Sequence, residues 1–210
     1  MKQNKPYLLG LTGSIGTGKS TTARMFGRLK IPVHDADAEV HHLLEHDKDV
    51  LTIVGMLFPE CLEQGKLNRM RLGLRVFHDR LALSQLEEIL HPRVRHLCEV
   101  FIEKHAKLGT PLAVLDIPLL FEAGYAPLCD KIIVTTCEPT VQRERVLARP
   151  GMVLEKFQKI LENQMPAAEK EKRADFLVDT THGRLDTFRQ LRHILDHVCL
   201  EVRPHARRRP

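Results

Sequence analysis

The sequence contains no tryptophan, only two tyrosines and no long hydrophobic run. Few aromatic side chains are available to stack on bases, although the eight phenylalanines could in principle serve, so we expect no nucleic-acid partner. No segment approaches the ~18 consecutive apolar residues of a membrane helix. The apolar start, Leu8–Leu11, is also too short for the core of a signal peptide. These absences predict a cytoplasmic enzyme or binding protein that has no membrane partner.

Cysteine and histidine patterns typical of metal or disulfide sites are also missing. The five cysteines are odd in number, scattered, and never spaced as C-x-x-C. They indicate neither a disulfide framework nor a zinc site, and we interpret them as reduced, mostly buried thiols. Twelve histidines are present, but none belongs to an H-E-x-x-H motif, so zinc binding is not expected.

The remaining composition is ordinary for a globular protein. Of the 210 residues, 43% are hydrophobic and 28% are charged, and the formal net charge is +5. This length favours one domain, residues 1–202, with room for a helical insertion. Four of the surplus charges are arginines in the last eight residues, so we expect residues 203–210 to be a basic, solvated and disordered tail.

Short apolar segments alternate with helical patterns along most of the chain. Strands are predicted at residues 7–11, 31–34, 112–115, 131–136 and 176–178, and helices at 20–29, 139–149, 153–164 and 184–199. Continuous apolar strands alternating with helices are typical of a parallel sheet that is covered on both faces. We therefore predict an α/β three-layer sandwich whose core comprises residues 7–37 and 108–200. Residues 38–107 contain no convincing strand and are predicted to be a helical insertion, in which His91-Pro92 opens the long helix.

The segment Gly13–Ser20 fits the pattern G-x-x-x-x-G-K-[ST] between a predicted strand and a predicted helix. Such glycines let successive backbone N–H groups point at a phosphate, and the helix N-terminus adds partial positive charge. Lys19 would reach the β- and γ-phosphates, and the Ser20 hydroxyl would ligate Mg²⁺. We expect the nucleoside triphosphate to contact Gly13, Ser14, Ile15, Gly16, Thr17, Gly18, Lys19, Ser20 and Thr21.

The rest of the sequence separates the classes of nucleotide-binding protein. A GTP-dependent switch would need an N-K-x-D tetrapeptide, which is absent. An ATP-driven motor would normally place an acidic pair after its Walker B strand, whereas Asp116 is followed by Ile117-Pro118. A small phosphotransferase fits better. A nucleotide-dependent regulatory or RNA-binding protein that uses the basic tail is the alternative from a different class.

A kinase also needs a carboxylate near its acceptor and arginines over the transferred phosphoryl group. Asp35 and Asp37 follow the second predicted strand, at the edge where open α/β sheets bind ligands. The alternative is that Asp37 caps a helix that starts near Ala38. Three arginines precede the break at residues 150–151, which predicts a lid at about residues 140–165; a solvated helix face is the alternative. These arginines are Arg143, Arg145 and Arg149.

Six motifs, in order from about residue 7 to residue 195, resemble those of the dephospho-coenzyme A kinase family. They are Gly10–Ser20, Asp35–Asp37, Gly65–Arg69 with Val76-Phe77, His91–Arg95, Asp116–Glu122, and a lid with Gln142, Arg145, Arg149 and Gln164 followed by Arg173–Asp175. The chain departs from the family pattern at Ser14, where a second glycine is usual. It also has Asn68 in place of the usual Asp and Thr180 in place of the usual Asn.

This resemblance implies a P-loop kinase fold with a five-stranded parallel sheet, a helical acceptor-binding insertion and a lid. It implies transfer of the ATP γ-phosphoryl group to the ribose 3′-hydroxyl of dephospho-coenzyme A, with Mg²⁺ as the metal. Asp37, Lys19 and Arg145 would be catalytic, and Arg149 would bind ATP. The acceptor would be bound by Asp35, Asp37, His91, Arg95, Leu119 and Glu122. Another small-molecule or nucleoside monophosphate kinase of this fold is the alternative, and the sequence leaves the oligomeric state open.

Overall fold

The computed structural model describes the backbone of residues 5–206 and the side chains of residues 5–202. This part of the chain forms two compact units, residues 5–34 with 102–206 and residues 35–101. The helical insertion was expected at residues 38–107. The second unit begins three residues before the expected start and ends six residues before the expected end. None of the helices in the described ranges is both long enough and apolar enough to cross a membrane.

The first unit is built on five strands in the order β2-β5-β1-β6-β7. Their bounds are β1 Tyr7–Gly13, β2 Val33–Asp35, β5 Leu112–Asp116, β6 Lys131–Thr136 and β7 Phe176–Asp179. Central strand β1 pairs in parallel with both neighbours, and Leu9 lies opposite Val114 and Lys131. The predicted five-stranded parallel sheet is confirmed, and β6 has the bounds that its apolar run predicts.

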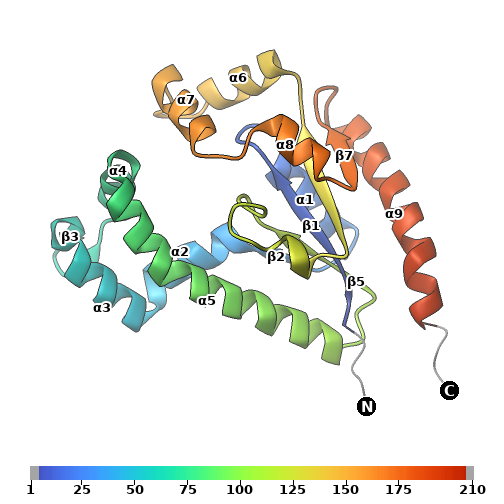
Figure 1. Cartoon of the computed structure of the whole chain (residues 1–210), viewed down its shortest axis with the longest axis horizontal. Helices are drawn as coiled ribbons and strands as arrows, with labels where there is room; N and C mark the ends of the chain where they lie inside the picture. Colours follow the sequence, from blue (N-terminus) through green and yellow to red (C-terminus); the bar gives the residue numbers. More distant parts are fainter. Residues whose placement is uncertain (1–4, 207–210) are drawn as a thin grey trace. The chain divides into compact units, whose positions relative to one another are not determined.

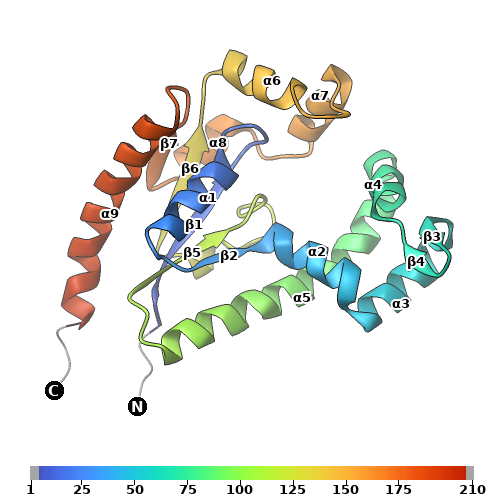
Figure 2. The ribbon, with the colours of Figure 1, turned by 180° about the vertical axis from the view of Figure 1, so that it is seen from behind.

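Helices cover both faces of this sheet. The helices of this unit are α1 Lys19–Arg28, α6 Pro139–Leu147, α7 Leu154–Glu162, α8 Ala167–Lys172 and α9 Arg184–Ala206, with a 3₁₀ turn at Ala126–Leu128. Helices α1, α8 and α9 contact the strands, whereas α6 and α7 lie beyond the carboxyl end of β6 (Figure 1). Helix α8 lies against β6 in front of the sheet in Figure 1, and the opposite view brings α1 forward (Figure 2). The sequence analysis missed α8. Helix α9 includes residues 203–206 of the segment expected to be a tail, and residues 207–210 lie outside the described part.

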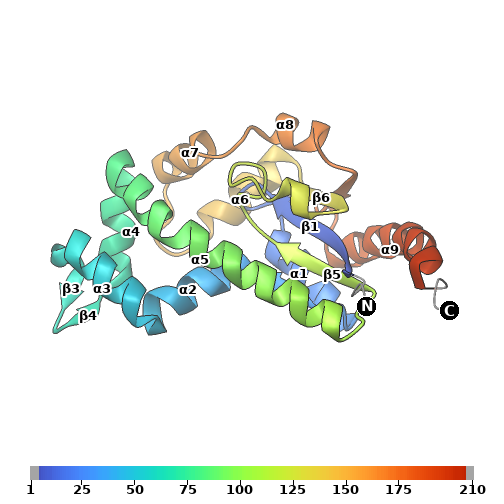
Figure 3. The same ribbon diagram turned by 60° about the horizontal axis from the view of Figure 1, so that its bottom comes forward.

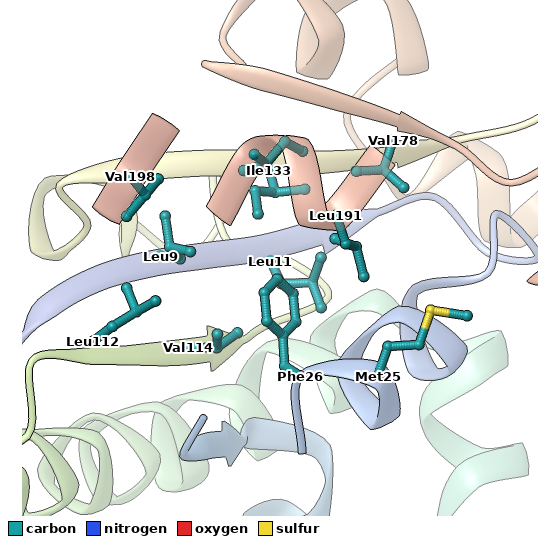
Figure 4. Packing of buried hydrophobic residues seen from close by; sticks show 11 residues of the cluster. Leu9, Leu11, Met25, Phe26, Leu112, Val114, Ile133, Val178, Leu191 and Val198 are labelled. Carbon is teal, nitrogen blue, oxygen red and sulfur yellow. The ribbon is translucent and has the colours of Figure 1, made fainter. Parts of the chain in front are cut away.

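A cluster of apolar side chains fills the core between the sheet and helices α1 and α9. Leu9 and Leu11 point to the same face because side chains alternate along a strand. Phe26 of α1 and Leu191 of α9 pack beside Leu11, and all of these side chains have 0% exposure (Figure 4). Burying each such side chain contributes about 1.5–3 kcal/mol. This core fixes α1 to the sheet and thereby fixes the loop between β1 and α1.

The second unit consists of four helices and a small hairpin. They are α2 Ala36–His46, α3 Lys48–Leu57, a 3₁₀ turn Pro59–Cys61, β3 Leu62–Glu63, β4 Lys66–Leu67, α4 Arg69–His78 and α5 Arg80–Lys107, whose last residues belong to the first unit. The hairpin lies beside α3 (Figure 3) and was not predicted, because two-residue strands leave no periodic signal.

Short polar side chains begin each helix of this unit. A side-chain oxygen before each helix accepts hydrogen bonds from backbone N–H groups of the first turn at 2.9–3.1 Å. The residues that supply these oxygens are Asp35, Asp47, Asn68 and Asp79. Such caps are worth ~1 kcal/mol each. Asn68 caps as well as the aspartate usual in the resembling family, which explains why this departure is tolerated.

The expectation that His91-Pro92 opens the long helix is wrong. Pro92 lies inside α5, a continuous helix of 28 residues. Proline has no N–H to donate to the carbonyl four residues earlier, which disfavours this position. Buried Ile89 and Val94 flank the proline, and the Arg93 guanidinium donates to the Ile89 carbonyl at 2.8 Å. Burial on both sides of Pro92 therefore outweighs the local cost.

We expect Gly10→Ala to lower the free energy of unfolding by about 1–3 kcal/mol, the usual cost of overpacking. A Cβ at Gly10 would lie 2.7 Å from both Leu120 Cδ1 and Cys129 Sγ on the second face of the sheet. Urea unfolding measures the effect. Gly27→Ala is the matched control, since nothing lies within 4 Å of its Cβ position and alanine favours a helix by about 0.5–1 kcal/mol. Equal stability of Gly10→Ala and wild type would contradict the packing described here.

Candidate functional site

The glycine-rich loop connects the carboxyl end of β1 to the start of α1. Gly18 is the N-cap of α1 and has φ of 89°, a left-handed conformation that glycine adopts without strain. Because glycine has no side chain, nothing from this position caps the helix. The first backbone N–H groups of a helix have no partner within it and form a ready site for an anion.

Lys19 makes an ion pair at the mouth of this loop. Its Nζ lies 2.7 Å from Asp116 Oδ1, and the two side chains are 12% and 3% exposed. The pairing of β1 with β5, which places Leu11 opposite Asp116, brings the two groups together. A cation and a carboxylate therefore meet where the sequence predicts a triphosphate.

Buried threonine hydroxyls support the loop from below. Thr17 Oγ1 donates to the Ser14 carbonyl at 2.7 Å and lies 2.9 Å from Thr135 Oγ1 of β6. A Cβ at Gly13 would lie only 2.1 Å from that Thr135 oxygen. The loop can therefore rest on β6 only because position 13 is glycine.

The predicted lid contacts the loop through two glutamines. Gln142 of α6 donates from Nε2 to the Ile15 carbonyl at 2.7 Å, and Gln164 accepts the Ile15 N–H at 3.1 Å. A Cβ at Gly16 would lie 2.5 Å from Val146 Cγ2, so α6 packs directly on the loop. Gln142 and Gln164, near the two ends of the predicted lid, thus both hydrogen-bond to the backbone of Ile15.

Arg145 is the lid arginine that contacts the base of the loop. Its Nη1 donates to Thr180 Oγ1 at 2.8 Å and its Nη2 to the Thr180 carbonyl at 2.7 Å. The same Thr180 hydroxyl donates to the Thr17 carbonyl at 2.9 Å. Arg143 and Arg149 are exposed. Thr180, one of the departures from the family pattern, therefore joins the lid to the loop.

The charge of Arg145 affects the pKa of two neighbouring groups, Asp179 and Cys137. Burial would raise the pKa of Asp179, but the Thr181 hydroxyl and N–H, His182 and Arg145 together lower it below its usual value. Burial raises the pKa of the Cys137 thiol, and Arg145 opposes this effect only in part. Cys137 therefore stays a protonated donor, 3.9 Å from the Gly16 carbonyl.

The loop after β5 contains Leu119 and Glu122, two of the predicted acceptor residues. Leu119 is half-buried. Glu122 Oε1 accepts the Met165 N–H at 2.8 Å and lies 3.0 Å from Lys170 Nζ. The sequence analysis missed Lys170, because a lysine in the charged run at residues 169–172 is typical of a solvated helix.

The other predicted acceptor residues belong to the second unit. Asp35 caps α2 through a hydrogen bond from the Ala38 N–H at 3.1 Å. The alternative in which Asp37 caps a helix from Ala38 is wrong, since α2 begins at Ala36 and Asp37 lies exposed in its first turn. His91 and Arg95 are exposed on α5, and Arg95 Nε lies 3.8 Å from Glu99. Four of the predicted acceptor residues thus lie within the second unit: Asp35, Asp37, His91 and Arg95.

Lys19 and Ser20 lie where a glycine loop meets the N-terminus of a helix, beside a parallel sheet and an arginine-bearing segment. This arrangement defines a P-loop kinase. The chain belongs to the dephospho-CoA kinase family, whose sequence model it matches over residues 7–186. A dephospho-CoA kinase of Rhodopseudomonas palustris strain HaA2 is 49% identical over 190 residues, covering 90% of this chain and 94% of the relative. One from Nitrobacter winogradskyi is 47% identical and covers 90% and 94%.

Solved structures agree with this assignment. A protein of Thermus thermophilus is 34% identical with a TM-score of 0.79, covering 92% of this chain and 98% of its own. The dephospho-CoA kinase of Campylobacter jejuni is 27% identical with a TM-score of 0.68, covering 91% and 96%. A shikimate kinase of Bacteroides thetaiotaomicron, 17% identical with a TM-score of 0.54, covers 91% and 98% and shares the fold alone.

We expect Thr180→Val to lower the free energy of unfolding by about 1–3 kcal/mol, because it keeps the side chain's shape but leaves the buried Thr17 carbonyl without its hydroxyl donor. It also removes one of the two contacts of Arg145. Thr180→Ser is the control, since it retains the hydroxyl. Chemical denaturation compares the three proteins, and equal stability of the valine and serine variants would show that the hydroxyl contributes nothing.

Proposed function

We propose that this protein transfers the γ-phosphoryl group of ATP to the ribose 3′-hydroxyl of dephospho-coenzyme A, giving coenzyme A and ADP. The match to the family over residues 7–186 carries the proposal. The glycine loop, with Lys19 at its mouth and Arg145 beside it, supports it independently. The cytoplasmic location expected from the sequence is part of this proposal. The expectation that the cysteines are mostly buried is wrong, since only Cys61 and Cys98 of the five are buried.

On the donor side, the loop residues and the N-terminus of α1 bind the phosphates of ATP. The Lys19 ammonium moves from Asp116 to the β- and γ-phosphates, which the flexible lysine side chain permits by rotation. Thr21 lies in the first turn of α1 and Arg149 in the turn after α6, and both belong to the proposed ATP site. The guanidinium of Arg145 stabilises the negative charge on the transferred phosphoryl group.

The side chains present at the loop fit Mg²⁺. Ser20 is exposed in the first turn of α1, and the Asp116 carboxylate ends the adjacent strand β5. Hydroxyl and carboxylate oxygens are the ligands that Mg²⁺ prefers. Ser20 would hold the ion, with Asp116 as a further oxygen ligand, and the ion would neutralise charge on the phosphates.

On the acceptor side, Asp37 is the proposed base. An acceptor hydroxyl is a poor nucleophile at neutral pH, and a carboxylate that accepts its hydrogen bond orients it and takes its proton. The remaining side chains proposed to bind the acceptor are Asp35, His91, Arg95, Leu119 and Glu122. The protein aligns the hydroxyl with the γ-phosphorus and excludes water, so that transfer outcompetes hydrolysis.

Acceptor choice tests the function. We expect purified protein with ATP and Mg²⁺ to release ADP when dephospho-coenzyme A is added, and to release far less with nucleoside monophosphates or with no acceptor. Coupled ADP detection across an acceptor panel gives the measurement. A site that binds a polar acceptor discriminates strongly against ligands that leave its groups unpaired. ADP release with a nucleoside monophosphate alone would favour the alternative kinase.

Asp37→Asn should lower kcat by roughly 10²-fold or more, the scale of a positioned acid–base group, while the ATP Kd and melting temperature stay near wild type. The substitution keeps the shape but removes the charge from an exposed side chain. Asp35→Asn should cost less, because asparagine caps a helix as well as aspartate does. Steady-state kinetics measures both. A larger loss in Asp35→Asn would move the base to Asp35, and full turnover in both variants would exclude this mechanism.

A further inference from the structure

Lys170 is wholly buried, which is rare because lysine is almost never taken out of water without a charged partner. It lies on α8 with a side-chain exposure of 0%, and its Nζ is 3.0 Å from Glu122 Oε1. The same Nζ is 3.5 Å from the Pro118 carbonyl. Both partners belong to the loop that follows β5. A buried cation on α8 therefore contacts this loop at two points.

The carboxylate of Glu122 also connects this loop to the end of the lid. Its Oε1 accepts the Met165 N–H at 2.8 Å. The preceding residue, Gln164, accepts the Ile15 N–H of the glycine loop at 3.1 Å. One oxygen atom thus joins α8, the segment after α7 and the loop after β5, and the residue just before Met165 contacts the glycine loop.

The start of the same loop is fixed to the central strand. Thr12 of β1 donates from Oγ1 to the Pro118 carbonyl at 2.9 Å, so this carbonyl is contacted from β1 and from α8. Lys170 is wholly buried and the Glu122 side chain is 22% exposed, and an ion pair that removes a charge from water adds little net stability, because the desolvation offsets the attraction. What the pair of Lys170 and Glu122 does impose is a fixed distance between α8 and the loop.

We propose that Lys170 is a positioning residue of the kinase, which holds Glu122 in the orientation that binds the acceptor and keeps the end of the lid beside the glycine loop. This inference rests on the proposed function, in which Glu122 belongs to the acceptor site. Lys170 itself is too deeply buried to touch a substrate, so it acts through Glu122.

The charge on Glu122 gives this role a specific signature. Burial would raise the pKa of Glu122, but the backbone N–H groups of Met165 and of Glu122 itself, together with Lys170, lower it below its usual value. Another cation beside this loop is Arg173, an exposed residue whose guanidinium carbon lies 5.9 Å from the centroid of the Phe121 ring. A carboxylate with a lowered pKa contributes stability above its unfolded value, which is lost as pH falls through the lowered value. Without Lys170 that loss moves to higher pH.

Lys170→Met, which keeps the length of the side chain and removes its charge, is the test. We expect KM for dephospho-coenzyme A to rise by roughly 10- to 100-fold, the cost of a small misplacement near the reacting groups. KM for ATP should rise less. The acid limb of kcat/KM for the acceptor should move to higher pH. Lys170→Arg should restore part of the affinity and the position of the acid limb.

Lys172→Met is the matched control. Lys172 lies on the same helix with 72% of its side chain exposed and pairs with Glu169 at 3.1 Å. Its loss should leave KM, kcat and the pH profile at wild-type values. If Lys170→Met melts at a lower temperature but has wild-type kinetic constants and an unmoved acid limb, the role proposed for Lys170 is wrong.

If Lys170→Met does not fold, the double variant Lys170→Met/Glu122→Gln is tested in its place. This variant removes both charges of the pair. The proposal then requires a raised acceptor KM without the shifted acid limb, and a wild-type acceptor KM overturns it. Wild-type turnover in the same assays separates the two levels of inference. Active wild type with an unaffected variant overturns only the role of Lys170, whereas inactive wild type overturns the proposed function and this role together.

Discussion

Close approach of neighbouring groups to the glycine loop is the constraint on which the rest of the site depends. A Cβ at Gly13 would lie 2.1 Å from Thr135 Oγ1, and one at Gly16 would lie 2.5 Å from Val146. A Cβ at Gly18 would meet a threonine after β7 at 2.9 Å. Strand β6, helix α6 and the segment after β7 therefore contact the loop only because it has no side chains there. The neighbours shape the loop as much as its own sequence does, and they hold its N–H groups ready for a phosphate without further reorganisation.

The ion pair at the loop has a consequence for what binds there. Lys19 and Asp116 are almost wholly buried, so their charges interact more strongly than in water. If an anion attracts the Lys19 ammonium, the buried Asp116 carboxylate loses its partner. Leaving that buried charge unpaired is costly. A divalent cation that arrives with the anion replaces the lost positive charge. In the proposed function, the pair would therefore favour a nucleotide accompanied by Mg²⁺ over the nucleotide alone.

Sequence reasoning found the sheet because its strands are continuous apolar runs, and it found the loop because glycine spacing and flanking elements are both required by phosphate binding. It failed where tertiary packing decides. Proline favours a helix start, yet Ile89 and Val94 are buried on either side of Pro92, and their burial keeps α5 continuous. Lys170 was missed for a similar reason, since its sequence neighbours are charged and only the folded chain brings Glu122 to it. Local patterns thus locate groups that act through the backbone, whereas a buried side-chain pair has no signal of its own.

The contacts of the lid limit how it can move. At its start, Gln142 binds the Ile15 carbonyl, and after its end Gln164 binds the Ile15 N–H. Each hydrogen bond is worth about 0.5–1.5 kcal/mol net, so detaching either end has a definite cost. Between these anchors the chain turns at Gly151, which has φ of 71° and nothing within 4 Å of its Cβ position. Gly151 is therefore the position between these anchors at which backbone rotation meets little steric hindrance. In the proposed function, a lid attached in this way would bring its arginines to the phosphates by a local rearrangement and would exclude water from the site.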